Sequence, residues 1–168
     1  RDACAEHPAG GDPRVRRHVT WREGGLLALR DEVLGQGRHE VVLSFVLPRS
    51  EVVVHGAGVS AALPGGLHLR LQSFDAPLAI EVEGPGFSSP PGRGWLAPRY
   101  GLREPGVMLR VRFARRVLPM RLLTLLQASC ESLPPEAALD GSDLRPVIRF
   151  PDGRTLEVVP SPAPGGGR

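Results

Sequence analysis

The chain has 168 residues, 41% of them hydrophobic, which is enough for one domain with a well-formed core. Its 21 glycines and 18 prolines interrupt the chain often, so many short strands are expected and long helices are hard to place. The net charge of +3 comes from 21 arginines scattered among 18 acids, and only 5% of residues are aromatic. This distribution argues against a nucleic-acid partner.

Signals for membrane insertion or targeting are not visible in this sequence. No apolar run reaches the roughly 18 residues that a membrane-spanning helix needs. The chain begins at Arg1 with neither Met nor an apolar signal segment, which is typical of a mature or excised fragment. We therefore expect any membrane attachment to come only from a downstream segment outside this sequence.

The first part of the chain shows the period of two that marks β-strands. Arg14–Trp21 has Val15, Val19 and Trp21 on alternate positions, and it ends at Gly24-Gly25. Leu26–Leu34 fits helical spacing, but a strand is equally allowed for so short a run. Glu40–Leu47 is apolar on both faces, which predicts a central, buried strand.

The segment Glu51–Val82 holds three short alternating runs separated by Gly and Pro, and it predicts three strands. Leu67, Leu69 and Leu71 share one face of their strand. Leu78, Ile80 and Val82 repeat the pattern. Such leucines are usually core, but an edge strand that meets a partner is the alternative, because an unpaired edge offers a row of donors and acceptors.

Further strands are predicted beyond the loop Gly84–Gly94. Trp95–Tyr100 is expected to form one helical turn, limited by Pro98. Val107–Phe113 alternates clearly, and Leu122–Ala128 forms another strand that leads to Cys130.

The composition changes after Cys130, where the chain becomes acidic and rich in proline. Pro146–Phe150 and Thr155–Val159 flank Pro-Asp-Gly, a good turn sequence, and together predict a terminal hairpin. The expected organisation is a β-domain over residues 1–132, a Pro-rich connection with the hairpin over 133–160, and a flexible tail over 161–168. The fold class that follows is all-β, a β-sandwich-like antiparallel domain with at most one or two short helical turns.

The two cysteines, Cys4 and Cys130, are too far apart for a CxxC redox or zinc motif. They form either one long-range disulfide or two buried free thiols. In a secreted protein the disulfide would contribute about 4–5 kcal/mol by the loop-entropy model.

Residues that carry chemistry are sparse. None of the five histidines has the spacing of a metal site, so no metal and no cofactor is expected. His55-Gly56-Ala57-Gly58 faintly resembles an oxyanion loop, but no G-x-S-x-G elbow accompanies it. Ser60 has no general base near it in sequence. The sequence therefore predicts a protein that binds rather than an enzyme.

Several ordered segments resemble the orphan region of the endoglin and betaglycan family, which are co-receptors of the TGF-β superfamily. The matching segments cover roughly Arg1–Ser132 and appear in the family's order: Arg1–Cys4, Val52–Leu63, Gln72–Asp75 with Leu78–Ile80, Gly94–Gly101, Leu118-Pro119 and Ala128–Cys130. The resemblance implies an extracellular, cell-surface β-domain without enzymatic activity. In this family the domain captures a growth-factor dimer at an edge, and a homodimer is one form expected of the parent receptor.

Carried over by position, the resemblance places the ligand-contacting strands at Leu67–Gln72 and Pro77–Val82. The ligand-binding residues that it implies are His68, Leu69, Arg70, Leu71, Pro77, Ile80 and Glu81. The implied partner is a bone morphogenetic protein, TGF-β or inhibin. The resemblance also leaves Cys4 as the one available partner for Cys130.

Two hypotheses besides the co-receptor remain open at this point. One is a secreted or periplasmic β-sandwich from a GC-rich bacterium, acting as an adhesion or structural module. The other is a cytosolic enzyme or subunit that carries two free thiols. Fold alone does not distinguish a co-receptor from a bacterial module.

Overall fold

The computed structural model describes residues 2–7, 13–84, 94–142 and 144–158, with only the backbone of residues 2–7. The loop predicted around residues 85–93 and the tail over 161–168 lie outside these ranges. The described residues form antiparallel strands and no helix, so the all-β class is confirmed. Accordingly, no helix in the described ranges is long and apolar enough to cross a membrane.

Fourteen strands are found in the described residues. They are β1 (Asp2–His7), β2 (Arg14–Arg22), β3 (Leu26–Leu34), β4 (Arg38–Pro48), β5 (Glu51–His55), β6 (Gly58–Leu63), β7 (Leu67–Ser73), β8 (Ala79–Glu83), β9 (Trp95–Arg99), β10 (Leu102–Val117), β11 (Met120–Ser129), β12 (Ala138–Ser142), β13 (Arg145–Arg149) and β14 (Thr155–Glu157).

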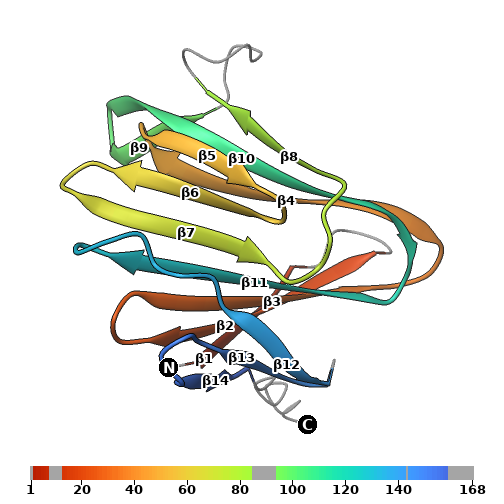
Figure 1. The fold of residues 1–168 in the computed structure, drawn as a ribbon. Coiled ribbons are helices and arrows are strands. Elements are labelled where there is room, and N and C mark those ends of the chain that lie inside the picture. The colour runs from red at the N-terminus through yellow and green to blue at the C-terminus, as the bar shows by residue number, and fades with distance from the viewer. Residues whose placement is uncertain (1, 8–12, 85–93, 143, 159–168) are drawn as a thin grey trace, which may run out of the picture.

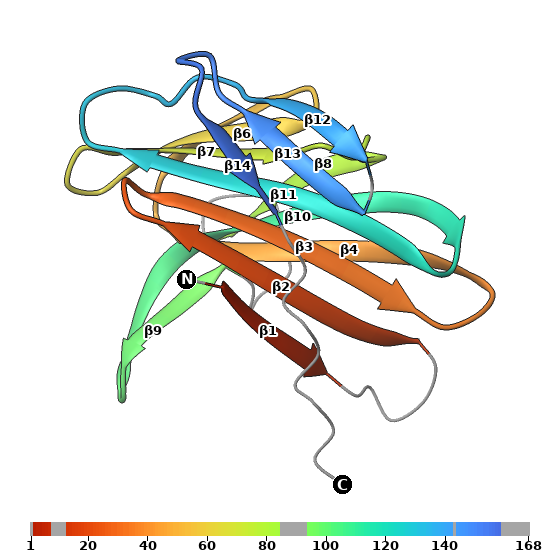
Figure 2. The same ribbon diagram turned by 90° about the horizontal axis from the view of Figure 1, so that it is seen from below.

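These strands build three layers. A seven-stranded sheet has the order β1-β2-β3-β11-β7-β6-β5, and a four-stranded sheet has the order β4-β10-β8 with β9 paired to β10. A third, small sheet has the order β12-β13-β14. The seven-stranded sheet lies between the other two, as the two views show (Figures 1 and 2).

The main core lies between the seven-stranded and four-stranded sheets. One wall comes from alternate residues of β6, β7 and β11, such as Val59, Leu71 and Leu122. The facing wall comes from β4 and β10, where Leu109 and Phe113 are fully buried. Burying each such side chain contributes about 1.5–3 kcal/mol, so this apolar face accounts for much of the fold's stability.

The second core lies on the opposite face of the seven-stranded sheet. Because side chains alternate along a strand, Leu123 and Leu125 of β11 point away from Leu122 and meet the third sheet. Ile148 of β13 and Leu156 of β14 close this core from outside and are buried. The predicted terminal hairpin is therefore present as β13 and β14, with β12 as an additional strand beside β13. Val159, the last residue of the predicted hairpin, lies outside the described residues.

A close turn between β2 and β3 requires glycine at residue 25. Gly25 has a φ of +76°, and a Cβ placed on it would lie 2.5 Å from the Ala128 carbonyl oxygen. The Gly25 carbonyl oxygen in turn accepts a hydrogen bond from the Ala128 amide at 2.9 Å. The Gly24-Gly25 break that the sequence predicts thus joins the β2–β3 turn to the end of β11.

Three local predictions differ from the structure. The helical turn expected at Trp95–Tyr100 is wrong, because this segment forms β9, which pairs with β10. The segment Glu51–Val82, expected to hold three strands, holds four, β5 to β8, the last of which reaches Glu83. The alternative left open at Leu26–Leu34 is decided as a strand, β3. Glu40–Leu47 was expected to be central, but β4 is the end strand of its sheet. Its second face carries Val42 and Val46, and Val46 is 41% exposed.

Candidate functional site

The two strands expected to dock a ligand do not form one edge. β7 lies in the middle of the seven-stranded sheet, with β11 on one side and β6 on the other. Its backbone groups are therefore already paired, and the expectation of an exposed edge at Leu67–Gln72 is wrong. β8 is an edge strand, but it belongs to the four-stranded sheet. The seven predicted ligand-binding residues are divided between the two sheets and the connection between them.

On β7 the predicted residues have structural contacts. Leu69 and Leu71 are buried in the main core, at 8% and 0% exposure, so they are not available to a ligand. On the other face, Arg70 donates from Nε to the Pro134 carbonyl oxygen at 2.6 Å. Its Nη1 lies 2.9 Å from Glu136 Oε1, and it thereby fixes the segment that leads to β12. His68, paired with Ala62 of β6 and Ser129 of β11, is half-buried.

On the second predicted strand, Ile80 packs against the main core and Pro77 is half-buried just before β8. Glu81 contacts two arginines of β10 on the outer face of the sheet. Its Oε2 lies 3.4 Å from Arg110 Nη1, and its Oε1 lies 2.8 Å from Arg112 Nη1. Glu81 is thus part of a row of ion pairs rather than an unpaired anchor.

Arg110 and Arg112, here called the ladder arginines, are matched by three carboxylates. Arg112 Nη2 lies 2.6 Å from Glu40 Oε1 of β4, and Arg110 Nη1 lies 3.1 Å from Glu83 Oε1 of β8. Hydrogen bonds to Glu81 and then Glu40 raise the pKa of Arg112 above its usual range. Because three carboxylates contact the two arginines across neighbouring strands, this outer face is a cross-strand ladder of ion pairs.

The expected disulfide is also wrong. Cys130 is a free, exposed thiol. The register shows why: Cys4 stands opposite His18, His18 opposite Arg30, and Arg30 opposite Leu123 of β11. Cys4 is therefore separated from β11 by β2 and β3. It is aligned with Leu123, which precedes Cys130 by seven residues along β11. A disulfide needs its two Cα atoms within roughly 7 Å, so the register forbids this pairing. The side chain of Cys4 lies outside the described part of the structure.

A pocket of about 380 Å³ lies at the start of β11, at the end of the sandwich where β10 turns into β11. It exists because β7 ends too early to cover this part of β11. The pairing of β11 with β7 begins at Thr124, whereas its pairing with β3 begins at Met120. After Ser73 the chain turns away, and the Asp75 carboxylate accepts a hydrogen bond from the Leu123 amide at 2.9 Å. We call this hollow the edge pocket.

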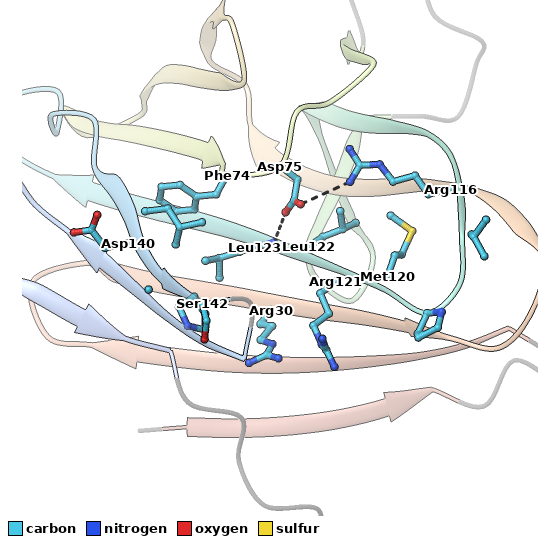
Figure 3. Close-up of a pocket in the computed structure, with 15 residues that line it drawn as sticks. Arg30, Phe74, Asp75, Arg116, Met120, Arg121, Leu122, Leu123, Asp140 and Ser142 are labelled. Atoms are coloured by element: carbon cyan, nitrogen blue, oxygen red, sulfur yellow. Dashed lines mark hydrogen bonds and ion pairs between the residues drawn. The ribbon is translucent and has the colours of Figure 1, made fainter.

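The edge pocket combines apolar surface with arginine side chains (Figure 3). Phe74, Met120 and Leu122 line it, together with Val117 and Leu139, which are 60% and 44% exposed. Its arginines come from three strands: Arg30 from β3, Arg116 from β10 and Arg121 from β11. Figure 3 shows Arg116 directed toward Asp75, and their closest atoms are 3.8 Å apart, which is too long for a hydrogen bond.

Beside the edge pocket, Glu32 of β3 is surrounded by three arginines and a histidine. Arg121 Nε and Arg30 Nη2 each lie 3.2 Å from its Oε1, and Arg16 Nη1 and His18 Nε2 lie 3.9 and 3.8 Å from its Oε2. Burial opposes the charge of Glu32, but the hydrogen bond from Arg121 and the charges of Arg30, Arg121 and His18 outweigh it. The pKa of Glu32 is therefore lowered, and the carboxylate stays ionised at neutral pH.

One contact of chemical interest was missed by sequence reasoning. His55 Nε2 lies 2.8 Å from Ser60 Oγ, because β5 and β6 form a hairpin that brings the two side chains to the same face. No contact of His55 with a carboxylate is found in the described residues, so the pair lacks the third group that orients a general base. In the same ranges no three His, Cys, Asp or Glu side chains are grouped as metal ligands require.

No protein-family model and no curated protein matches the sequence. Solved structures share the fold. A heparinase III (BT4657 gene product) is 18% identical with a TM-score of 0.68, and a heparan sulfate lyase HepC mutant from Pedobacter heparinus is 11% identical with a TM-score of 0.72. Each match covers 94% of this chain but only 25% of the other chain. The chain thus spans about a quarter of the length of these lyases.

Proposed function

We propose that this chain is the β-sandwich module of a larger protein that acts on an acidic polysaccharide, and that the module alone is not a lyase. The observation that carries the proposal is the shared fold: nearly the whole chain aligns with a quarter of two heparan sulfate-lyase structures.

The test compares this chain with the complete product of its gene. A lyase cleaves by elimination and leaves a carbon–carbon double bond in the new sugar end, which absorbs ultraviolet light. We expect the complete product to release this chromophore from an acidic polysaccharide, such as heparan sulfate or hyaluronan, but not from neutral dextran. This chain alone should release none. Cleavage by the chain alone, or no cleavage of any acidic polysaccharide by the complete product, would contradict the proposal.

The co-receptor hypothesis stays a prediction, because nothing in the comparisons bears on it. One feature favours it, the edge strand β8. A biosensor panel of TGF-β-superfamily dimers tests it with the variants Glu81→Arg and His68→Ala. Retention of a dimer, with a changed off-rate in Glu81→Arg, would support a co-receptor. The hypothesis of a bacterial structural module is close to the lyase-module proposal, and its adhesion role stays a prediction.

A further inference from the structure

The edge pocket lies beside a short stretch of β11 that β7 does not cover. Leu123 directs its amide to Asp75 and its carbonyl oxygen to the Phe74 amide, so both groups point to the side where β7 lies. Backbone direction alternates along a strand, so Arg121 directs its amide and carbonyl to the same side. β7 has already ended there. The amide of Arg121 therefore faces the pocket as a hydrogen-bond donor.

Positive charge is concentrated around this end of the sandwich. Arg38, Arg115, Arg116 and Arg121, here called the turn arginines, lie on β4, β10 and β11, next to the β10–β11 turn. Among the described residues their carboxylate contacts are Glu32 for Arg121 and Asp75 for Arg116. Arg38 donates to the Arg115 carbonyl oxygen, and the Arg115 side chain is exposed.

Glu32 does little to neutralise the turn arginines, because it is shared with Arg16 and Arg30. The Asp75 carboxylate is committed to the Leu123 amide through one oxygen and is 3.8 Å from Arg116 through the other. Arg116 and Arg121 are 42% and 47% exposed at the side chain, so both are accessible to a ligand. Guanidinium groups bind carboxylates and sulfates through paired hydrogen bonds.

The apolar surface of the pocket further limits the class of ligand that fits it. Val117 and Leu139 line the pocket and expose apolar surface, and Phe74 lines it as a half-buried side chain. A simple inorganic anion makes no favourable contact with apolar surface, whereas a sugar ring presents C–H groups that pack on it. Pockets that join apolar walls to a few placed polar groups are typical of small-ligand sites.

We infer that the edge pocket binds an acidic sugar unit of a polysaccharide, with its anionic group on the Arg116 guanidinium and the Arg121 amide and its ring against Phe74 and Leu139. The anionic group is a sulfate or a carboxylate, which share this chemistry. The choice of a sugar as the ligand rests on the proposed function, whereas the anionic group and the apolar contact rest on the geometry of the pocket. The inference concerns binding by this chain alone, so it holds or fails separately from any lyase activity.

The test is a calorimetric titration of the chain with a heparin hexasaccharide, a hyaluronan hexasaccharide and neutral maltohexaose. The pocket variant is Arg116→Gln. The matched control is Arg99→Gln on the β9–β10 hairpin, which removes one arginine charge from an exposed position that does not line the pocket. Unfolding curves verify that both variants are folded.

We expect binding of at least one acidic hexasaccharide and none of maltohexaose. The pocket variant should lose at least ten-fold in affinity and the control less than three-fold. Binding of heparin alone assigns a sulfate as the bound group, and binding of hyaluronan assigns a carboxylate. The inference is overturned by no binding, by equal losses in the two variants, or by duplex DNA binding in the same titration as tightly as the acidic hexasaccharide.

A second pair of variants probes the apolar wall without altering the arginines. Leu139→Glu places a negative charge at the pocket rim, and Leu133→Glu places one at a position 37% exposed that does not line the pocket. Affinity should fall at least ten-fold in Leu139→Glu and less than three-fold in Leu133→Glu. Equal affinities in these two variants would exclude the proposed ring position.

Discussion

The ladder arginines and the turn arginines are the same residue type in opposite electrostatic settings. Arg110 and Arg112 lie within the four-stranded sheet, where three carboxylates on neighbouring strands balance them. The four turn arginines lie where strands end, and two carboxylates contact them. A strand interior provides partners at fixed cross-strand distances, whereas a sheet end provides few. The comparison separates arginines that stabilise the sheet from arginines that remain available to a ligand.

The largest expected effect comes from the carboxylate that holds Arg121 and Arg30. Glu32→Gln removes the carboxylate from a group of arginines that includes the buried Arg30, and we expect a loss of about 2–4 kcal/mol in the free energy of unfolding at pH 7. Urea unfolding measures it. Glu40→Gln, on the exposed ladder, should change the same free energy by less than about 0.5 kcal/mol. Equal losses of unfolding free energy in Glu32→Gln and Glu40→Gln would contradict the distinction between the ladder arginines and the arginines that Glu32 contacts.

The pH dependence sharpens the same test. The pKa of Glu32 is lower in the folded protein than in the unfolded chain, so its stabilisation is present above the ordinary glutamate pKa. This stabilisation disappears as the pH falls through the lowered value. The difference in unfolding free energy between wild type and Glu32→Gln should therefore be constant near neutrality and shrink in acid. A difference that grows in acid would contradict the assignment.

A smaller effect is expected from the ladder itself. Arg112→Gln removes two ion pairs on a solvent-facing surface, where screening weakens each pair. We expect a small decrease in the thermal midpoint at low salt that vanishes at high salt, measured by scanning calorimetry. A decrease that persists in high salt would show that packing, rather than charge, is what Arg112 contributes.

The smallest effect is predicted for Cys130→Ser. Because Cys130 is a free and exposed thiol, its replacement should change the unfolding free energy by less than about 0.5 kcal/mol. Wild type should also react with one more equivalent of a thiol reagent under native conditions than the variant does. A loss near the ~4–5 kcal/mol of a long-range disulfide would restore the Cys4–Cys130 pairing.

Alternation in the sequence predicted most strands, because period-two runs such as Val107–Phe113 report directly on burial of one face. It did not predict sheet order. The alternating pattern of Leu69 and Leu71 is the same for an edge strand and for a central strand. Only the pairing of β7 with both β6 and β11 shows that this strand is central. For the same reason a continuous apolar run made β4 look central although it is an end strand.

The edge pocket could not be predicted from the sequence for a related reason. It depends on β7 ending before it covers the first residues of β11, and that offset is set by register. Arg116 and Arg121 are five residues apart, in no motif, among 21 arginines of similar appearance. A usable signal was present in Arg115-Arg116 beside a turn at Leu118-Pro119, but its meaning depends on which strands end nearby.

The most direct test of the distinction between the two arginine groups is a map of backbone amide chemical shifts during titration with the heparin and hyaluronan hexasaccharides. We predict that the largest shifts fall on Asp75, on Arg115–Leu123 apart from Pro119 and on Leu139–Ser142, while Arg110, Arg112 and β8 remain unchanged. Shifts concentrated on the ladder arginines or on β8, or no shifts with either sugar, would contradict the account.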